Sequence, residues 1–260
     1  MKRCFAICAL ALLLAGCTSA AAEDEVVVYA AASLTNAFEE LGTAFEAEHP
    51  SVTVTLNFGA SSQLASQLAE GAQADVFASA NPAQMQVAED AGRIERHLDF
   101  ASNRLVVIVP AGNPAKITGL ADILAPNRLA LVLAAPGVPV RDYTDEALDR
   151  LTESDSGLDR GAISTNLVSE EANVRQVVAK VALGEADAGV VYTTDVTPDV
   201  ADQLEVIEIP DAFNVTATYP IGLVAGAPHP ALARQFIDFV LSADGQAILA
   251  EWGFGPPVGR

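Results

Sequence analysis

The sequence predicts an α/β protein folded as two lobes, and three observations support this. Runs rich in β-branched residues alternate with segments of helical periodicity from about residue 25 onward. This alternation is typical of mostly parallel sheets covered by helices on both faces. The chain of 260 residues has the length of one large domain or of two lobes of roughly 100–130 residues each. Two strand-like segments, 104–114 and 219–230, end in turn residues and are the expected crossings between the lobes.

The first residues are predicted to be an export signal rather than part of the fold. Two basic residues precede an apolar run, 5–14, that is too short to span a bilayer as a lasting helix. The LAGC sequence ending at Cys17 resembles a bacterial lipobox. This implies a signal peptide over 1–16, lipidation of the Cys17 thiol and a tether over 17–24, with the protein anchored on the periplasmic or extracellular face of a membrane. An ordinary secretory signal with an incidental cysteine is the alternative, and it also predicts export.

Charge and cysteine usage exclude several classes of protein. The net charge of −20 gives a surface that repels nucleic acid and anionic lipid headgroups, so a site for an anion must act at close range. All three cysteines (Cys4, Cys8 and Cys17) lie in the export segment, so the folded body is predicted to hold no disulfide and no thiolate metal site. No later apolar run has the length and purity of a membrane-spanning helix.

The elements follow one another with recognisable start and stop signals. A β-branched strand at 25–30 leads into an amphipathic helix that ends before Pro50, and the alternating segment 52–58 is a second strand. A second helix begins near residue 62 and ends at Gly71. The later strands are expected at 74–80, 104–114, 127–136 and 187–195, and the later helices at 141–151, 173–184 and 231–254, the last broken near Gly245.

Two strand-to-helix turns carry a serine, and such turns are where open α/β sheets bind ligands. Ser33 follows three alanines, and Ser61 follows Gly59 and Ala60. A serine at this place commonly caps its own helix. The same place also offers unpaired N–H groups and the positive end of the helix dipole, which bind anions. Ser61 is not expected to be a nucleophile, because the second glycine of G-x-S-x-G is absent.

Three further turns offer hydrogen-bond donors. Val140 follows a proline-stiffened loop and has a free N–H at the start of a helix. Asn173 is a candidate N-cap, which leaves Val174 with a first-turn N–H. Tyr192 ends the strand AGVVY, where its hydroxyl either projects into a cleft or is satisfied within the core.

Together these segments resemble one family. AAASLTNAFEEL, FGASSQLASQLAEGAQADVFASAN, VPVRDYTDEAL, NVRQVV and GVVYTTD occur in the order and spacing of the periplasmic molybdate-binding proteins of ABC transporters, the ModA family. The resemblance runs from about residue 25 to Phe254. It implies a type II periplasmic-binding-protein fold, in which crossing strands join two α/β lobes around a ligand cleft. Lobe 1 would span 25–104 plus 222–260, and lobe 2 would span 105–221.

The resemblance also implies a site made of neutral donors. The ligand, molybdate and usually tungstate, would be bound by the hydroxyl and N–H of Ser33 and of Ser61, the N–H groups of Val140 and Val174, and the hydroxyl of Tyr192. No cofactor is implied, since molybdenum would enter only as bound molybdate. The implied partners are the permease of an ABC transporter and the membrane, through the lipid anchor, and a monomer is expected.

One residue departs from the family pattern. Arg141 stands where the family often has glycine. It is expected either as a surface arginine on the first turn of a helix or as a group that reaches the ligand or clamps the two lobes.

Other functions are kept as alternatives. An enzyme is not expected, because the three histidines lie far apart in sequence and no zinc-site spacing, P-loop or G-x-G-x-x-G turn occurs. A binding protein for tungstate only, or for sulfate, phosphate, a metal chelate or an organic acid, would bind that solute and be indifferent to molybdate. A lipoprotein that only contacts other proteins would bind no small ligand.

Overall fold

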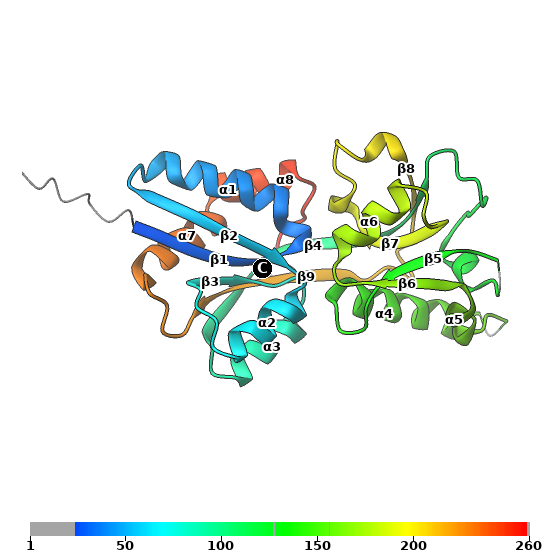
Figure 1. Cartoon of the computed structure of the whole chain (residues 1–260), viewed down its shortest axis with the longest axis horizontal. Helices are drawn as coiled ribbons and strands as arrows, with labels where there is room; N and C mark the ends of the chain where they lie inside the picture. Colours follow the sequence, from blue (N-terminus) through cyan, green and yellow to red (C-terminus); the bar gives the residue numbers. More distant parts are fainter. Residues whose placement is uncertain (1–23, 127, 156, 259–260) are drawn as a thin grey trace, which may run out of the picture.

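The computed structural model describes residues 24–258 except residues 127 and 156. Within these residues, nine strands form one continuous sheet in the order β2-β1-β3-β9-β4-β7-β5-β6, with β8 paired to β4. Helices cover both faces of this sheet, and the molecule has the predicted two lobes (Figure 1). The proposed signal peptide and lipidated cysteine lie outside the described residues.

The first lobe is built on three parallel strands. The strand β1 (Asp24–Ala31) lies between β2 (Val52–Gly59) and β3 (Val76–Ala78) and is parallel to both. Figure 1 shows α1 and α8 on one face of these strands and α2 and α3 on the other. The helices of this lobe are α1 (Thr35–Glu48), α2 (Ser61–Ala69), α3 (Pro82–Asp90), α7 (Pro230–Leu241) and α8 (Ala243–Glu251).

The second lobe repeats this arrangement. The strand β5 (Leu131–Ala134) lies between β6 (Leu167–Glu171) and β7 (Ala188–Tyr192) and is parallel to both, while β8 (Leu204–Glu208) lies beside β4. Figure 1 shows α4 and α6 on opposite faces. The helices of this lobe are α4 (Pro139–Ser154), α5 (Ile163–Asn166) and α6 (Val174–Ala182).

Two antiparallel strands join the lobes. The strand β4 (Ile94–Pro110) pairs with β9 (Thr216–Val224) as far as Arg104 and then pairs with β7 and β8. Both predicted crossings therefore overlap long strands, but β4 begins ten residues before the predicted start at residue 104. Two register irregularities interrupt its first half. They break the alternation of polar and apolar residues by which a strand is recognised.

Four of these helices and strands, α3, α5, β6 and β8, were missing from the prediction, and the break in the C-terminal helical segment was misplaced. The short helix α3 and the polar edge strands β6 and β8 have weak hydrophobic patterns, although Asn81 caps α3 by accepting the Gln84 N–H (2.9 Å). The break between α7 and α8 is at Ser242 rather than near Gly245, because the Ser242 hydroxyl accepts the Gly245 N–H and so starts α8. The antiparallel pairings of β4 and β9 also reduce the parallel share of the sheet below the expectation.

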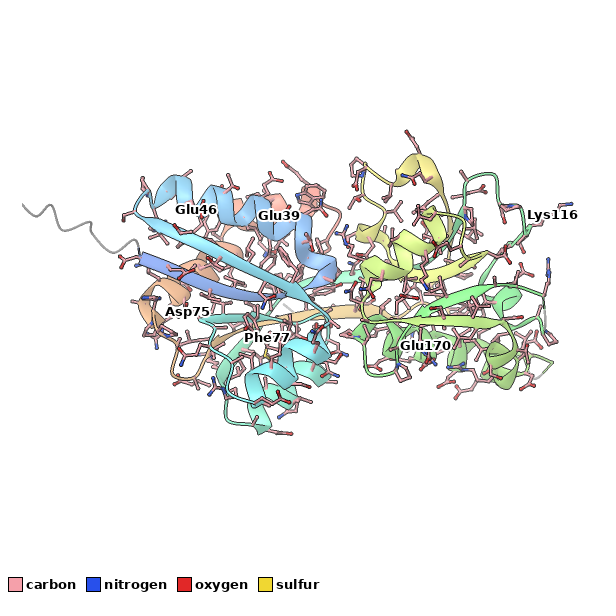
Figure 2. All side chains as sticks on the ribbon, in the orientation of Figure 1. Glu39, Glu46, Asp75, Phe77, Lys116 and Glu170 are labelled. Carbon is pink, nitrogen blue, oxygen red and sulfur yellow. The ribbon has the colours of Figure 1, made fainter. Side chains whose placement is uncertain are left out.

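The core lies between the sheet and its helices. On the α1 side of the first lobe, Phe38, Phe45 and Phe236 are fully buried and pack edge to face. Phe77 lies on the opposite side, in the cluster formed with α2 and α3 (Figure 2). Across the described ranges, no helix has the length and apolar character needed to cross a membrane. The apolar clusters on the two faces of the sheet hold the carboxyl ends of β1 and β2 in place, where the chain turns into helices.

Candidate functional site

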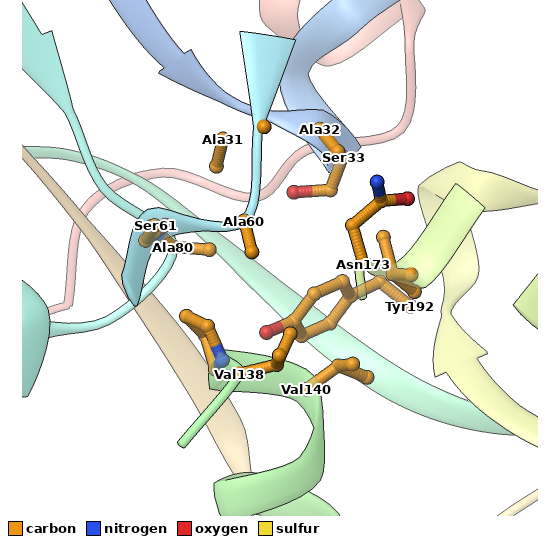
Figure 3. A pocket seen from close by; sticks show the side chains of 13 residues that line it. Ala31, Ala32, Ser33, Ala60, Ser61, Ala80, Val138, Val140, Asn173 and Tyr192 are labelled. Atoms are coloured by element: carbon orange, nitrogen blue, oxygen red, sulfur yellow. The ribbon is translucent and has the colours of Figure 1, made fainter. Parts of the chain in front are cut away.

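A small pocket lies between the lobes, where the turns after β1 and β2 face the first turns of α4 and α6 (Figure 3). Its cavity volume is about 10 Å³, roughly one water-sized sphere and far below that of pockets for drug-sized ligands. It therefore suits a small ligand. Its lining comes from both lobes: Ala31, Ala32, Ser33, Gly59, Ala60, Ser61 and Ala80 from the first, and Val138, Pro139, Val140, Asn173, Val174 and Tyr192 from the second.

All five residues predicted to bind the ligand line this one pocket. They are Ser33, Ser61, Val140, Val174 and Tyr192. Ser33 and Ser61 belong to the first lobe and the other three to the second, so the complete set exists only when the two lobes meet. The alanines and Gly59 beside the serines keep the lining slim and let a ligand approach the backbone closely.

The hydroxyl of Ser33 points into the pocket and does not cap a helix (Figure 3). Ser33 lies in a 3₁₀ turn, Ala32–Leu34, and the N-cap of α1 is Leu34, which makes no side-chain cap. The Ser33 Oγ instead lies 3.1 Å from the hydroxyl oxygen of Tyr219. The interpretation of Ser33 as an ordinary helix cap is therefore wrong.

Ser61 is also free of a capping role. It is the first residue of α2, after an N-cap at Ala60 that makes no side-chain cap. Its Oγ accepts the N–H of Ala80 at 2.9 Å, and the side chain is 1% exposed. Because the oxygen already accepts a hydrogen bond from the protein, the hydroxyl proton is left to be donated into the pocket.

Tyr192 presents an unpartnered hydroxyl. It ends β7, is 1% exposed, and its ring lies across the pocket in Figure 3. Among the described residues, its buried hydroxyl has no hydrogen-bond partner. Leaving such a group unpaired costs about 1–3 kcal/mol, and this marks the hydroxyl as a position for a ligand. Burial raises the pKa of Tyr192 well above its usual value, so the hydroxyl keeps its proton and acts as a neutral donor. The unpartnered hydroxyl favours the interpretation that it projects into a cleft over that of a satisfied core tyrosine.

Two helix N-termini complete the donor set. Val140 is the second residue of α4, after Pro139, and Val174 is the first residue of α6. First-turn N–H groups have no acceptor within their own helix and lie at the positive end of its dipole. Asn173 caps α6 as predicted, by accepting the Gln176 N–H at 3.2 Å. Both valines are buried, at 1% and 4% exposed, so bulk water does not serve these groups.

The pocket contains donors without formal charge. No charged side chain is found among its lining residues in the described part of the chain. Asp195 lies behind the wall, fully buried, where it accepts the Tyr192 N–H at 3.1 Å and pairs with Arg175 at 3.3 Å. A site of this kind suits an anion that has several acceptor oxygens and no proton to donate, because a lining carboxylate would repel it.

Arg141 neither reaches the pocket nor joins the lobes. Its guanidinium donates to Asp145 (3.1 Å), to Glu170 (2.8 Å) and to the Ala134 carbonyl (3.1 Å), all in the second lobe. Its side chain is 12% exposed, so it is largely covered rather than a free surface arginine. The arginine that does join the lobes is Arg175.

Residues that the sequence did not predict hold the lobes together beside the pocket. Arg175 in α6 donates to the Ala32 carbonyl at 3.3 Å and to Asn36 Oδ1 at 2.8 Å, both in the first lobe. Gln84 in α3 donates to the Gly137 carbonyl at 3.1 Å. Each contact joins segments far apart in the chain, and no local motif marks them.

The sequence has clear relatives. Residues 26–255 match the family model described as bacterial extracellular solute-binding protein. The molybdate-binding protein ModA of Mycobacterium tuberculosis (strain ATCC 25618 / H37Rv) is 42% identical over 233 residues, which is 89% of this chain and 85% of that protein. The molybdate-binding protein ModA of Escherichia coli (strain K12) is 33% identical over 258 residues, which is 96% of each protein. A family of binding proteins rather than of enzymes agrees with the sequence prediction.

Solved structures show the same fold. The periplasmic molybdate-binding protein of Azotobacter vinelandii matches with a TM-score of 0.75 and 21% identity, over 89% of this chain and 99% of that one. The sulfate-binding protein SubI of Mycobacterium tuberculosis H37Rv matches with a TM-score of 0.76 and 20% identity, over 91% and 88%. The fold is thus common to proteins named for different oxyanions, and it does not by itself select among them. On the strength of its sequence matches, the chain belongs to the bacterial extracellular solute-binding protein family, and within that family to the ModA proteins.

Proposed function

We propose that this protein captures molybdate, and tungstate as well, and delivers it to the permease of an ABC transporter. The observation that carries the proposal is the convergence in one small pocket of the hydroxyls of Ser33, Ser61 and Tyr192 with the first-turn N–H groups of Val140 and Val174. The relatives support it, because the matches at 42% and 33% identity are named molybdate-binding proteins.

The chemistry of the ion fits this donor set. Molybdate is a tetrahedral dianion with four acceptor oxygens and, at neutral pH, no proton to donate. Hydrogen bonds to a charged group contribute roughly 1.5–3 kcal/mol each, and ordering and desolvation offset much of their sum. A net binding free energy of about −8 to −12 kcal/mol follows, which corresponds to dissociation constants from micromolar to nanomolar.

Size is the remaining basis for selection among dianions. Sulfate has the same charge and the same number of acceptors, so only the dimensions of the pocket can separate it from molybdate and tungstate. A binding protein for sulfate or another oxyanion is the second candidate, because such an anion could use the same neutral donors.

Closure of the lobes would complete the site. Lobe 1 is proposed to span 25–104 plus 222–260, and lobe 2 to span 105–221, with the ligand between them. The serines of the first lobe and the donors of the second would contact the same anion. The permease would then recognise the closed form of a monomeric binding protein.

A thermal-shift panel tests the proposed function. Purified protein is heated with molybdate, tungstate, sulfate, phosphate or buffer alone. A ligand at 100 times its dissociation constant adds about 2.7 kcal/mol, which raises the melting temperature of a chain of this size by roughly 5–11 °C. A rise with molybdate and tungstate but not with sulfate supports the proposal. A rise with sulfate alone favours the second candidate, and no rise with any oxyanion contradicts both.

The family is extracytoplasmic, and a lipid anchor would hold this member at the membrane. We propose that Cys17 carries the lipid, because the preceding LAG resembles a lipobox. Full-length protein expressed in bacteria with labelled fatty acid should incorporate the label and sediment with membranes. The Cys17→Ser variant should lose both properties, and a labelled variant would rule out this cysteine as the anchor.

A further inference from the structure

The Ser33 hydroxyl is one end of a buried hydrogen-bond chain that begins behind the pocket. Its Oγ lies 3.1 Å from the Tyr219 hydroxyl, and Asn103 Nδ2 lies 3.4 Å from that same hydroxyl. Tyr219 is 0% and Asn103 4% exposed, and neither residue lines the pocket. Both come from the crossing strands, Asn103 from β4 and Tyr219 from β9. The chain of contacts therefore connects the strands that join the lobes to one predicted ligand-binding group.

The direction of the hydrogen bonds in this chain follows from its far end. Asn103 Oδ1 accepts the Arg104 N–H at 2.9 Å, which assigns Nδ2 as the donor atom. Nδ2 donates to Thr194 Oγ1 at 2.8 Å and to the Tyr219 oxygen. Tyr219 thus already accepts a hydrogen bond, and its own proton requires an acceptor.

Ser33 is the acceptor that remains for the Tyr219 proton. Burial raises the pKa of Tyr219 well above its usual value, so the proton stays on the oxygen. The neighbouring Tyr219 is close enough to add to the rise in the pKa of Tyr192, and the two rings are 5.8 Å apart, but the Tyr192 hydroxyl has no partner in hydrogen-bond geometry among the described residues. Tyr219 therefore donates to Ser33 Oγ. The Ser33 proton is then directed away from Tyr219, into the pocket where Figure 3 shows the hydroxyl.

We propose that Tyr219, oriented by Asn103, is a positioning residue that holds the Ser33 hydroxyl as a donor toward the ligand. The inference rests on the proposed function and deepens it by naming a cause of selectivity. A serine hydroxyl that is free to turn can either donate to a bare oxygen or accept the proton of a hydrogen-bearing anion. A serine whose oxygen accepts from Tyr219 keeps its proton for the ligand and has one acceptor site fewer, so it favours a fully deprotonated oxyanion. The Ala80 N–H holds Ser61 in the same way.

The Tyr219→Phe variant tests this positioning, with Tyr143→Phe as the matched control. Tyr143 is partly buried beside the same aromatic rings, with its ring 6.4 Å from that of Tyr192, but its hydroxyl accepts the Thr218 N–H at 3.1 Å and does not contact Ser33. Calorimetric titration of molybdate should show affinity weakened on the order of tenfold in Tyr219→Phe and changed less than about twofold in Tyr143→Phe.

A double-mutant cycle separates positioning from a general structural effect. In a Ser33→Ala background, Tyr219→Phe should change molybdate affinity by less than about twofold, because the hydroxyl it positions is gone. In a Ser61→Ala background, the full tenfold loss should persist. In Tyr219→Phe, the affinity for phosphate near pH 6, measured by competition with molybdate, should weaken less than the affinity for molybdate. Phosphate carries protons at that pH, and the freed serine can accept a hydrogen bond from one of them.

The outcomes distinguish this inference from the proposed function. Wild-type protein that does not bind molybdate overturns both. The positioning alone is overturned if the wild type binds molybdate and Tyr219→Phe binds it equally well. It is also overturned if Tyr219→Phe loses the same factor in molybdate affinity in the Ser33→Ala background. If the melting temperature shows that Tyr219→Phe does not fold, Asn103→Ala releases Tyr219 from its other side. That variant should lose a few-fold in affinity, and only when Ser33 is present.

Discussion

Arg175 and Asp195 form an ion pair beside the pocket, with Arg175 Nε 3.3 Å from a carboxylate oxygen of the fully buried Asp195. The same Nε lies 3.3 Å from the Ala32 carbonyl, and the Arg175 guanidinium also donates to Asn36 at 2.8 Å. Asp195 and Arg175 belong to the second lobe, while Ala32 and Asn36 belong to the first. Asp195 thus holds in place the side chain that ties the second lobe to the first.

Removing this tie should speed ligand release. We expect Arg175→Ala to raise the dissociation rate of molybdate on the order of tenfold, because two hydrogen bonds between the lobes are lost from the closed form. Arg141→Ala is the control, since its partners Asp145 and Glu170 lie in its own lobe. Stopped-flow measurement of release gives both rates. Equal rates in the two variants would show that Arg175 does not hold the lobes together.

The stability of the fold should depend on the protonation of Asp195. Burial raises the pKa of Asp195 from 3.8 to about 6, against the opposing effects of Arg175 and of the Tyr192 N–H. The folded protein therefore binds this proton more tightly than the unfolded chain does. The charged carboxylate lowers the free energy of unfolding above pH 6, and this penalty is relieved as the pH falls toward 4.

The Asp195→Asn variant makes this dependence measurable. From pH 7 to pH 4, the unfolding free energy of the wild type should rise relative to that of the variant by up to about 3 kcal/mol. Urea unfolding at several pH values measures the difference, in which the contributions of carboxylates shared by both proteins cancel. A difference that stays constant between pH 4 and pH 7 would contradict the raised pKa.

Ser61 should contribute to affinity more than its neighbour on the same helix does. Ser61→Ala removes a hydroxyl whose oxygen is occupied by the Ala80 N–H and whose proton is directed to the ligand. We expect molybdate affinity to fall ten- to a hundredfold. Ser62 does not line the pocket, so Ser62→Ala should change affinity by less than about twofold. An unchanged affinity in Ser61→Ala would remove Ser61 from the binding site.

Tyr192→Phe should affect binding and stability in opposite directions. In the ligand-free protein the buried hydroxyl has no partner among the described residues, so its removal should leave the unfolding free energy unchanged or raise it by up to about 1 kcal/mol. Molybdate affinity should nevertheless fall at least tenfold. Urea unfolding without ligand and calorimetric titration measure the two effects. A clear loss of stability without ligand would mean that the hydroxyl has a partner within the protein.

Much of the binding surface could be predicted because it lies at strand-to-helix turns. Ser33, Ser61, Val140 and Val174 lie in the first turns of helices or directly before them, and Tyr192 ends a strand. Such positions are visible in a sequence because the change from a β-branched run to helical periodicity marks them. The same local patterns suggested that the two serines cap their helices, and that interpretation was wrong because their hydroxyls have partners far away in the chain.

The alternation of strands and helices, the turns that carry donors and the absence of cysteine from residues 18–260 can thus be read directly from the sequence. The direction in which those donors point depends on contacts that form only when the chain folds. Ser33 is paired with Tyr219 and Ser61 with Ala80, while Arg175 is held by Asp195 and reaches the first lobe. This difference arises because backbone periodicity is a local property of the chain. The direction of a hydroxyl proton instead depends on which distant donor folding brings to its oxygen.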